Sequence, residues 1–271
     1  MDILRSAFTG LAVVPRPFSK LCEPLLSLDL ESKMTSLPIA LILTLPIGLA
    51  LASPAPGGLS LTEPHAVSAV ADWGELAWSP SGDGLSAHGQ GGLWLLSLDG
   101  GEPQPVLDPA GRPTFRHRWP GAPAVEPAVY ARRDDIWLRG DDGDRRLTQG
   151  QDRFYDPVLS PDGGRVVFSG LVTGLHIMDL GSGELTHLGT GRWPTWHPDS
   201  DHLVFERNLD DGHVLTQADL LLWSPALSAP EVLTATPEHL DRFPTFSPDG
   251  SSLAWVRDGA VHVARVVGVA P

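Results

Sequence analysis

The stretch "FSPDG" (residues 246–250) contains a complete turn signal. Proline presets φ near −65°, aspartate bonds the local backbone, and glycine accepts positive φ. The last four letters recur as "SPDG" at 160–163, and looser copies are "HPDS" at 197–200 and "SPSG" at 79–82. Runs rich in β-forming residues flank the copies, as in "TFSPDGSSLAWV", so each copy predicts a tight β-hairpin.

The turns recur at intervals that point to a repeat. Pro80, Pro161, Pro198 and Pro248 are separated by 81, 37 and 50 residues. A diverged copy after "RPTF" (112–115) would divide the first interval in two and give five units of roughly 40 residues, a period typical of propeller blades or helical arrays. Helical arrays are excluded, because the units are rich in glycine, proline and β-branched residues and their apolar residues alternate with a period of two.

Each unit continues with two more predicted strands after its hairpin. A third strand lies in stretches such as "GGLWLLSLDGG" and "TGLHIMDLGSG", and a short fourth strand ends in "QPVL" or "LTHL". Four antiparallel strands per unit predict an all-β fold, a closed β-propeller with five blades favoured. Six blades would require a further blade in the 50-residue interval, which a long loop, "RNLDDGHVLTQA" (207–218), explains better.

The two ends of the repeat region complement each other. The last unit stops after "AVHVARVV" (260–267) without a fourth strand, whereas "GLSLTEP" (58–64) is a fourth strand with no unit before it. Pairing the two would remove two exposed sheet edges, which otherwise invite aggregation. We therefore expect the strand near residues 59–62 to complete the last blade.

The repeat resembles that of TolB-like, WD-repeat-like β-propellers. The likeness rests on the pattern Pro-x-aromatic-Ser-Pro-Asp-Gly, followed by "RVVF" or "SLAW" and then "HIMDL", and it covers about residues 59–271. The resemblance implies a propeller that engages protein partners in the cell envelope, or one of the kind that precedes the hydrolase domain of prolyl oligopeptidases. We expect neither a TolB-type α/β domain before residue 59 nor a hydrolase domain after residue 271.

The N-terminal region has the features of an export signal. Residues 37–52 are apolar and end in Ala50-Leu51-Ala52, a small-x-small pattern like those that precede signal-peptide cleavage. We expect residues 1–52 to be an extension and signal peptide with translation starting at Met34, residues 53–58 to be a linker, and the mature protein to be periplasmic or secreted. A retained anchor is the alternative. Cys22 precedes the apolar run, which argues against a lipoprotein.

Composition narrows the classes of partner. After residue 52 the chain has no cysteine or lysine, and its 15 arginines face 29 acidic residues, for a net charge of −14. Such a surface argues against nucleic acid, which binds clustered basic residues. About 215 residues can bury a sufficient core without disulfides.

Motifs for catalysis or cofactors are absent from the sequence. There is no Gly-x-Ser-x-Gly, no His-Glu-x-x-His and no phosphate loop. The ten histidines are scattered, and His176 and His262 fall on predicted third strands, so we predict no metal site and no cofactor. A calcium ion in a propeller channel stays an open question.

Partner-binding residues are expected on one face of the propeller, where the loops from fourth to first strands and from second to third strands emerge. The candidate residues on these loops are Asp72, Trp73, Arg112, Asp152, Tyr155, Asp156, Arg192, Trp193, His213, Asp241, Arg242 and Phe243.

Two interpretations of this face stay open. The repeated pairs Arg192-Trp193 and Arg242-Phe243 suit either ion pairs between neighbouring blades or an interface, where arginine and aromatic residues dominate the binding energy. The favoured function is non-enzymatic binding of a protein or peptide. The alternative is a glycan-active hydrolase or lyase that uses Asp72, Asp156 and Asp241 around the channel.

Overall fold

The computed structural model describes residues 58–69, 71–112, 128–150, 152–210 and 212–268, all within the compact unit Leu51–Pro271. These residues form 19 β-strands and no helix, and consequently contain no helix able to span a membrane. The expected signal segment and the diverged repeat at 113–127 lie outside the described residues.

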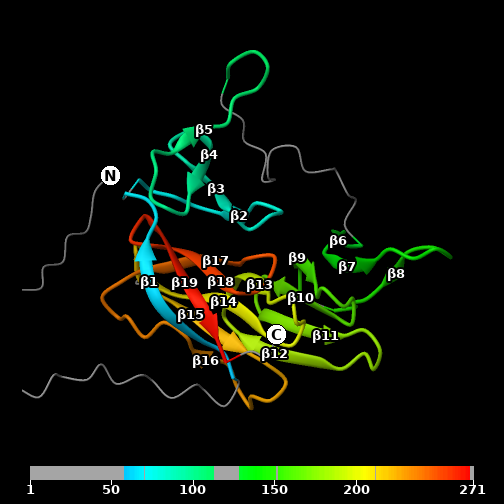
Figure 1. Ribbon diagram of the computed structural model, residues 1–271. Coiled ribbons are helices and arrows are strands. Elements are labelled where there is room, and N and C mark those ends of the chain that lie inside the picture. Colours follow the sequence, from blue (N-terminus) through cyan, green and yellow to red (C-terminus); the bar gives the residue numbers. More distant parts are fainter. Residues whose placement is uncertain (1–57, 70, 113–127, 151, 211, 269–271) are drawn as a thin grey trace, which may run out of the picture. The chain divides into compact units, whose positions relative to one another are not determined.

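The strands form five antiparallel sheets that follow one another along the chain (Figure 1). The first sheet contains β2 (Leu76–Trp78), β3 (Gly84–Gly89), β4 (Gly92–Ser97) and β5 (Gln104–Pro105). The second contains β6 (Val129–Arg132), β7 (Asp135–Leu138) and β8 (Arg145–Arg146). The third contains β9 (Phe154–Leu159), β10 (Arg165–Gly170), β11 (Gly174–Asp179) and β12 (Leu185–Gly189). The fourth contains β13 (Arg192–Trp196), β14 (Leu203–Asp210), β15 (Leu215–Trp223) and β16 (Glu231–Val232).

The fifth sheet joins both ends of the described chain. It contains β17 (Asp241–Phe246), β18 (Ser252–Arg257) and β19 (Ala260–Val267), and its fourth strand is β1 (Ser60–Ala66). β1 pairs antiparallel with β19, with Leu61 opposite Val266. The expected pairing of the N-terminal strand with the last unit is therefore confirmed.

The four turn motifs form the expected hairpins. In each, the amide of the fourth residue donates to the carbonyl of the first, at 3.0 Å for Gly82 and 2.9 Å for Gly163, Ser200 and Gly250. These fourth residues all have positive φ, between 67° and 75°. Glycine adopts this conformation without a steric penalty, which explains why three of the four turns end in it.

The predicted long loop at 207–218 is wrong. Arg207–Asp210 continue β14, and Leu215–Ala218 begin β15. The polar letters of this stretch suggested a loop, but Arg207 lies opposite Asp219 and Asn208 opposite Ala218, so strand pairing satisfies the backbone. The additional residues of the 50-residue interval thus lengthen one hairpin.

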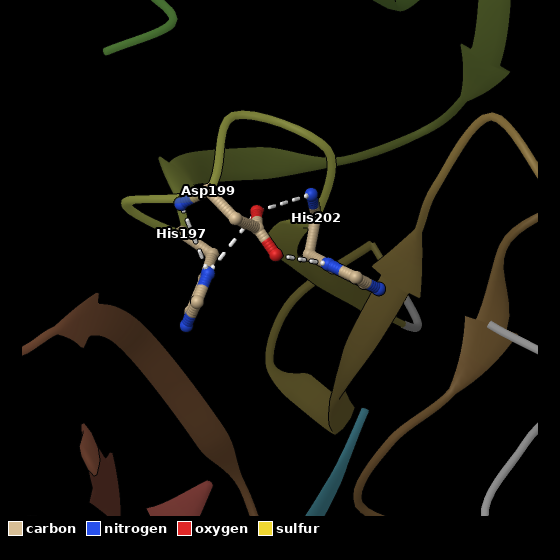
Figure 2. A group of neighbouring side chains, drawn as sticks. All are labelled: His197, Asp199 and His202. Atoms are coloured by element: carbon tan, nitrogen blue, oxygen red, sulfur yellow. Dashed lines mark hydrogen bonds and ion pairs between the residues drawn. The ribbon is translucent and has the colours of Figure 1, made fainter. Parts of the chain in front are cut away.

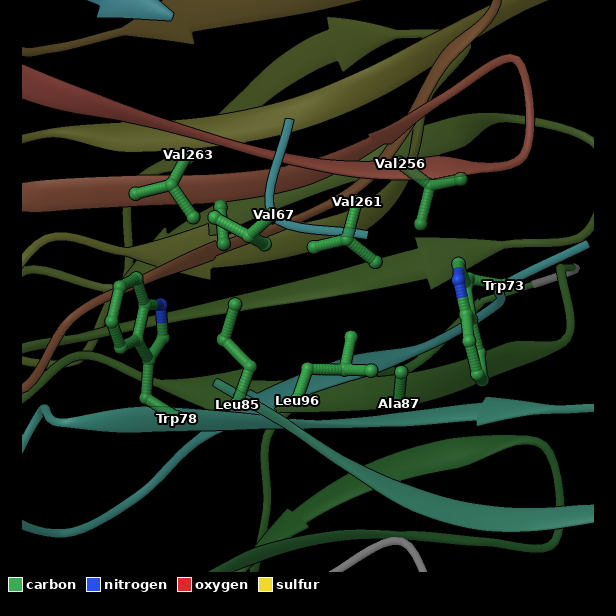
Figure 3. Packing of buried hydrophobic residues seen from close by; sticks show 10 residues of the cluster. Val67, Trp73, Trp78, Leu85, Ala87, Leu96, Val256, Val261 and Val263 are labelled. Carbon is green, nitrogen blue, oxygen red and sulfur yellow. The ribbon is translucent and has the colours of Figure 1, made fainter. Parts of the chain in front are cut away.

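Four buried clusters hold neighbouring sheets together. Apolar residues join the second sheet to the third, the third to the fourth, and the fourth to the fifth. The remaining cluster joins the first sheet to the fifth. In it, Leu85 and Leu96 lie against Val261 and Val263 (Figure 3). Truncating one such leucine to alanine typically costs about 2–5 kcal/mol.

Tryptophans at equivalent positions join the sheets in the same way. Trp196, just before its turn, donates its indole N–H to the carbonyl of Val158 on β9 at 3.1 Å. Trp78, just before the first turn, donates to the carbonyl of Thr245 on β17 at 3.0 Å. The same kind of hydrogen bond thus joins the first sheet to the fifth and the fourth sheet to the third.

Candidate functional site

A pocket of about 520 Å³ opens where the third, fourth and fifth sheets meet. It brings together Tyr155, Arg192, His213 and Arg242, four of the predicted residues, from β9, β13, the β14–β15 loop and β17. The turn from β10 to β11 completes the wall with Leu171 and Val172. The expected convergence of fourth-to-first and second-to-third connections is thus seen for these residues.

A bulge recurs in the first strands of the third, fourth and fifth sheets and places one tyrosine and two arginine side chains. Asp156, Trp193 and Phe243 each precede a proline and have φ of 48°, 52° and 54°. The strand register shifts at this position in all three sheets. A bulge of this kind redirects side chains at the rim of a sheet. Tyr155, Arg192 and Arg242, each one residue earlier, consequently line the same pocket.

Arg242 is held by a buried carboxylate. Its Nε donates to Glu206 Oε1 on β14 at 3.1 Å, and the amide of Phe243 donates to Glu206 Oε2 at 3.0 Å. Glu206 is completely buried, so the arginine neutralises its charge between the fourth and fifth sheets. The guanidinium also lies 4.5 Å from the Phe243 ring centroid. For this pair the structural interpretation is therefore correct.

Arg192 differs from its equivalent in the fifth sheet. Its side chain is exposed at the pocket and makes no hydrogen bond or ion pair with any residue that the structure describes. An arginine presents five donors in a planar fork suited to a carboxylate. Arg192 is therefore the cation at this pocket that is available to a ligand.

Exposed aliphatic side chains border the same pocket. Leu171 is 60% exposed, Val172 is 86% exposed and Val214 is 61% exposed. They lie on two different loops, and all three line the pocket. Apolar side chains gathered at one hollow, with polar groups around them, are typical of a binding surface.

Asp152 fixes one of these loops. It accepts hydrogen bonds from the amides of Val172 and Thr173, at 3.2 and 2.9 Å, and from Thr173 Oγ1 at 2.5 Å. The Thr173 hydroxyl is the main cause that lowers the pKa of Asp152 to about 2, against partial desolvation. This predicted binding residue thus positions the turn that carries Leu171 and Val172.

A smaller hollow of about 200 Å³ lies beside the first strands of three sheets. Glu75 and Leu76, Trp193 to Thr195, and Phe243 to Thr245 line it. The rings of Trp193 and Phe243 meet edge to face there, with centroids 5.1 Å apart. Trp193 is 39% exposed, so its indole contributes accessible apolar area next to Arg192.

The remaining predicted residues lie apart from the larger pocket. Trp73 is only 4% exposed and belongs to the core between the first and fifth sheets. Arg112 pairs with Asp108 at 2.8 Å. Asp72 is exposed in the segment before β2, and Asp156 is exposed at the bulge within β9. Asp241 is buried and accepts hydrogen bonds from Trp255, Thr236 and, through two nitrogens, Arg257.

The carboxylates do not have the pattern of a glycosidase. Such an enzyme needs a pair of carboxyl groups, one of them with a raised pKa. Among the described carboxyl groups, every clear pKa shift is downward, as at Asp152, Asp199 and Asp258. The buried Asp241 and Glu206 each face an arginine. These groups are arranged for structure.

One group of side chains could hold a metal ion among the described residues. His197, Asp199 and His202 converge at the β13–β14 turn, outside both hollows (Figure 2). We predicted no metal site from the sequence, because no single histidine there has the spacing of a known metal-binding motif.

Sequence reasoning also missed Glu206 and the three exposed aliphatic residues. Glu206 stands in the apolar run "LVFERN", where the equivalent strands have Ser169 or Val256. A carboxylate inside a buried strand usually has a charged partner, so this position could have been recognised. Nothing in the letters around Leu171, Val172 and Val214 distinguishes an exposed aliphatic side chain from a buried one.

Comparisons with known proteins give only distant likenesses. No family model matches the chain, and no curated protein matches it. A structure assigned as TolB from Agrobacterium tumefaciens has 20% identity and a TM-score of 0.38, over 74% of this chain and 91% of that one. TolB from Acinetobacter baumannii has 17% identity and a TM-score of 0.36, over 72% of this chain and 54% of that one.

A prolyl endopeptidase structure has 15% identity and a TM-score of 0.39, over 78% of this chain and 29% of that one. This chain thus spans about half the length of the Acinetobacter protein and under a third of the endopeptidase. Likeness at this level carries no statement about function.

Proposed function

We propose that this chain is a non-enzymatic recognition protein that binds a protein or peptide partner at the 520 Å³ pocket. The observation that carries the proposal is Arg192, an exposed guanidinium with no described partner, next to the exposed side chains of Leu171, Val172 and Val214. Arginine and apolar anchors at one hollow are the typical means by which interfaces gain affinity. The matching ligand is a segment with an aliphatic side chain close to a carboxylate.

The proposal includes a closed five-bladed propeller over residues 59–271. The pairing of β1 with β19, the core between the first and fifth sheets, and the equivalent bonds of Trp78 and Trp196 support closure. A closed ring accounts for the contact between the first and fifth sheets. It also leaves no long unpaired edge strand at either end.

We further place the mature protein in the cell envelope, beginning near Ser53. The apolar run 37–52 and the pattern Ala50-Leu51-Ala52 support this placement. Mass spectrometry of the protein purified from its native source tests it. A mature N-terminus near residue 53 is expected, and a chain that retains residues 34–52 would contradict the cleavage.

The binding test compares three variants with the unaltered protein in quantitative capture from an envelope extract. Arg192→Ala and Val172→Ser should each reduce capture of the same partner by roughly tenfold or more, which corresponds to about 1.4 kcal/mol. Both side chains are exposed, so the melting temperatures should stay within a few degrees.

The matched control is Arg265→Ala. Arg265 is also an exposed arginine on a strand, but it does not line the pocket. It should capture the partner normally. A partner retained equally by Arg192→Ala and Val172→Ser, with both variants folded, would remove this pocket from consideration.

A further inference from the structure

His197 and His202 lie opposite each other across a β-turn. The amide of His197 donates to the carbonyl of His202 at 2.8 Å, so the two residues close the hairpin between β13 and β14. Residues opposed in this way have Cβ atoms about 5 Å apart and project from one face. Asp199 lies within the turn between them, and its carboxylate reaches both rings (Figure 2).

The three side chains already have nearly the spacing of metal ligands. His197 Nδ1 lies 3.1 Å from Asp199 Oδ1, and His202 Nδ1 lies 2.7 Å from Asp199 Oδ2. Zinc binds histidine nitrogen and carboxylate oxygen at about 2.0–2.2 Å, so neighbouring ligands of a tetrahedral ion are about 3.3 Å apart. The potential ligand atoms of the three residues all lie within 4.8 Å of one another, so modest side-chain movements would bring them to the spacing around one ion.

A contact from outside the cluster determines which ring nitrogen of His197 carries the hydrogen. Its Nε2 lies 3.1 Å from the carbonyl oxygen of Gly250, in the turn of the fifth sheet. A carbonyl only accepts, so Nε2 carries the hydrogen and the neutral ring has its lone pair on Nδ1. Donation from a ligating histidine to a backbone carbonyl is the usual outer support of a metal site.

The lone pair on Nδ1 then has an unfavourable neighbour. Nδ1 accepts the hydrogen of the Asp199 amide at 3.2 Å, and Asp199 Oδ1, which carries negative charge, lies 3.1 Å from the same nitrogen. A cation bound by Nδ1 and the carboxylate would replace the amide hydrogen bond and offset the repulsion between the two acceptor atoms. The His197 ring is fixed in this orientation, because it is 7% exposed and packs edge to face on Phe246, with centroids 5.0 Å apart.

The equivalent turns have no such arrangement. Ser160 Oγ donates to Asp162 at 2.6 Å, and Ser247 Oγ donates to Asp249 at 2.7 Å. In those turns the serine hydroxyl also accepts the amide hydrogen of the residue five positions later. A serine at the first position is therefore sufficient for the turn. The two histidines supply potential metal ligands that the hairpin itself does not require.

We propose that His197 Nδ1, the Asp199 carboxylate and His202 Nδ1 bind one divalent transition-metal ion of the zinc type. Imidazole and carboxylate donors suit zinc. The side chains of Asp199 and His202 are 24% and 13% exposed, so water can reach the ion and complete its coordination. Because Gly250 belongs to the next sheet, the ion would also fasten the fourth sheet to the fifth.

The test uses the untagged protein, freed of metal with a chelator and titrated with Zn²⁺ in a calorimeter. We expect one ion per chain and a melting temperature that rises with Zn²⁺, because an ion that binds the folded state stabilises it. When Co²⁺ replaces Zn²⁺, the bound ion should show the visible absorption that is typical of cobalt with a low coordination number. The absence of one-to-one binding would overturn the proposal.

The decisive variant is His197→Ser with His202→Ser, which copies Ser247 and Ser252 of the fifth sheet and keeps Asp199. It should fold and lose at least about 100-fold in Zn²⁺ affinity, since both imidazole ligands are gone. His65→Ala, at an exposed histidine on β1, is the control and should bind as the unaltered protein does.

Unchanged Zn²⁺ binding by the double variant would place the ion elsewhere and refute the site. If the double variant melts early in chelator, Asp199→Asn decides instead. Its amide oxygen still accepts from the amides of Asp201 and His202 but is a poor zinc ligand, so affinity should again fall strongly.

Discussion

Two glycines with the same backbone conformation have different surroundings. Gly163 and Gly250 each end a Ser-Pro-Asp-Gly turn, and both have φ of 73°. A Cβ on Gly163 would meet nothing within 4 Å, whereas one on Gly250 would lie 2.4 Å from His197 Nε2. The sequence predicts the positive φ of both glycines, but only the structure shows what lies beside them.

This difference predicts unequal effects of the same substitution. Gly163→Ala should cost about 1 kcal/mol from the left-handed conformation alone. Gly250→Ala should cost a further 1–3 kcal/mol, roughly, because it also forces buried His197 to move. Chemical denaturation of both variants measures the difference. Equal losses would show that His197 does not pack on this turn.

The charge of Asp152 makes the β10–β11 turn sensitive to acid. The pKa of Asp152 is about 2 in the folded protein, below the ordinary value, chiefly because the Thr173 hydroxyl donates to it. A lowered folded pKa contributes stability that is fully present above the unfolded pKa and is lost as the pH falls through the folded one.

Asp152→Asn should therefore destabilise the protein near neutral pH, and its deficit in melting temperature should shrink between about pH 5 and about pH 2. Asp156→Asn, at an exposed aspartate with no described hydrogen bond, is the comparison and should show little change at any pH. A deficit for Asp152→Asn that is the same at both ends of the range would contradict this role.

At the scale of elements, two strands with the same local sequence have different roles. Arg192-Trp193 on β13 and Arg242-Phe243 on β17 share a bulge and a positive φ. The sheet that precedes β17 carries the buried Glu206 on its second strand, β14. Arg242 therefore has an ion-pair partner there, whereas the Arg192 side chain has none among the described residues. The pairs look alike in sequence because the difference lies on another strand, β14.

Substitution of the two arginines should separate these roles. Arg242→Ala leaves the charge of Glu206 buried without its partner and should cost about 2 kcal/mol. For a domain of this size that is a fall of about 4–8 °C in melting temperature. Arg192→Ala should stay within about 2 °C of the unaltered protein.

Adding Glu206→Gln to Arg242→Ala should recover part of the loss, because the buried charge is then removed. Circular dichroism melts of the two single variants and the double variant measure this. An Arg242→Ala variant as stable as the unaltered protein would contradict the ion pair.

Several elements could be predicted from sequence because their signals are local. The four hairpin turns and the short fourth strands follow from proline, aspartate and glycine at fixed offsets. The length of β14 and β15 could not be predicted, since the polar residues 207–210 are held by cross-strand pairing. The metal-binding geometry of the fourth turn needed the distance between two rings and the carbonyl of Gly250, which lies 53 residues away in sequence.

At the scale of the whole molecule, the pocket depends on strands from distant parts of the chain. The pairing of β1 with β19 was predictable because one end of the repeat region lacked a strand and the other had one in excess. The number of blades was less accessible, because the diverged copy at 113–127 has no recognisable turn motif and lies outside the described residues. The equivalent bonds of Trp78 and Trp196 could not be read from either tryptophan alone.

The most direct test of closure removes the closing strand. β1 is the edge strand of the fifth sheet, next to β19, and Leu59 just before it is 1% exposed in the core shared by the fourth and fifth sheets. Deleting residues 53–64 removes this leucine and opens the edge of β19. The loss should exceed that of one buried leucine, about 2–5 kcal/mol, and lower the melting temperature by about 10 °C or more.

The measurement is a pair of thermal melts, on the chain with residues 53–64 and on the chain without them, at the same concentration and in the same buffer. A large fall in the melting temperature of the shortened chain is the result expected for a propeller closed by β1. An unchanged melting temperature, with the same circular dichroism spectrum, would contradict it.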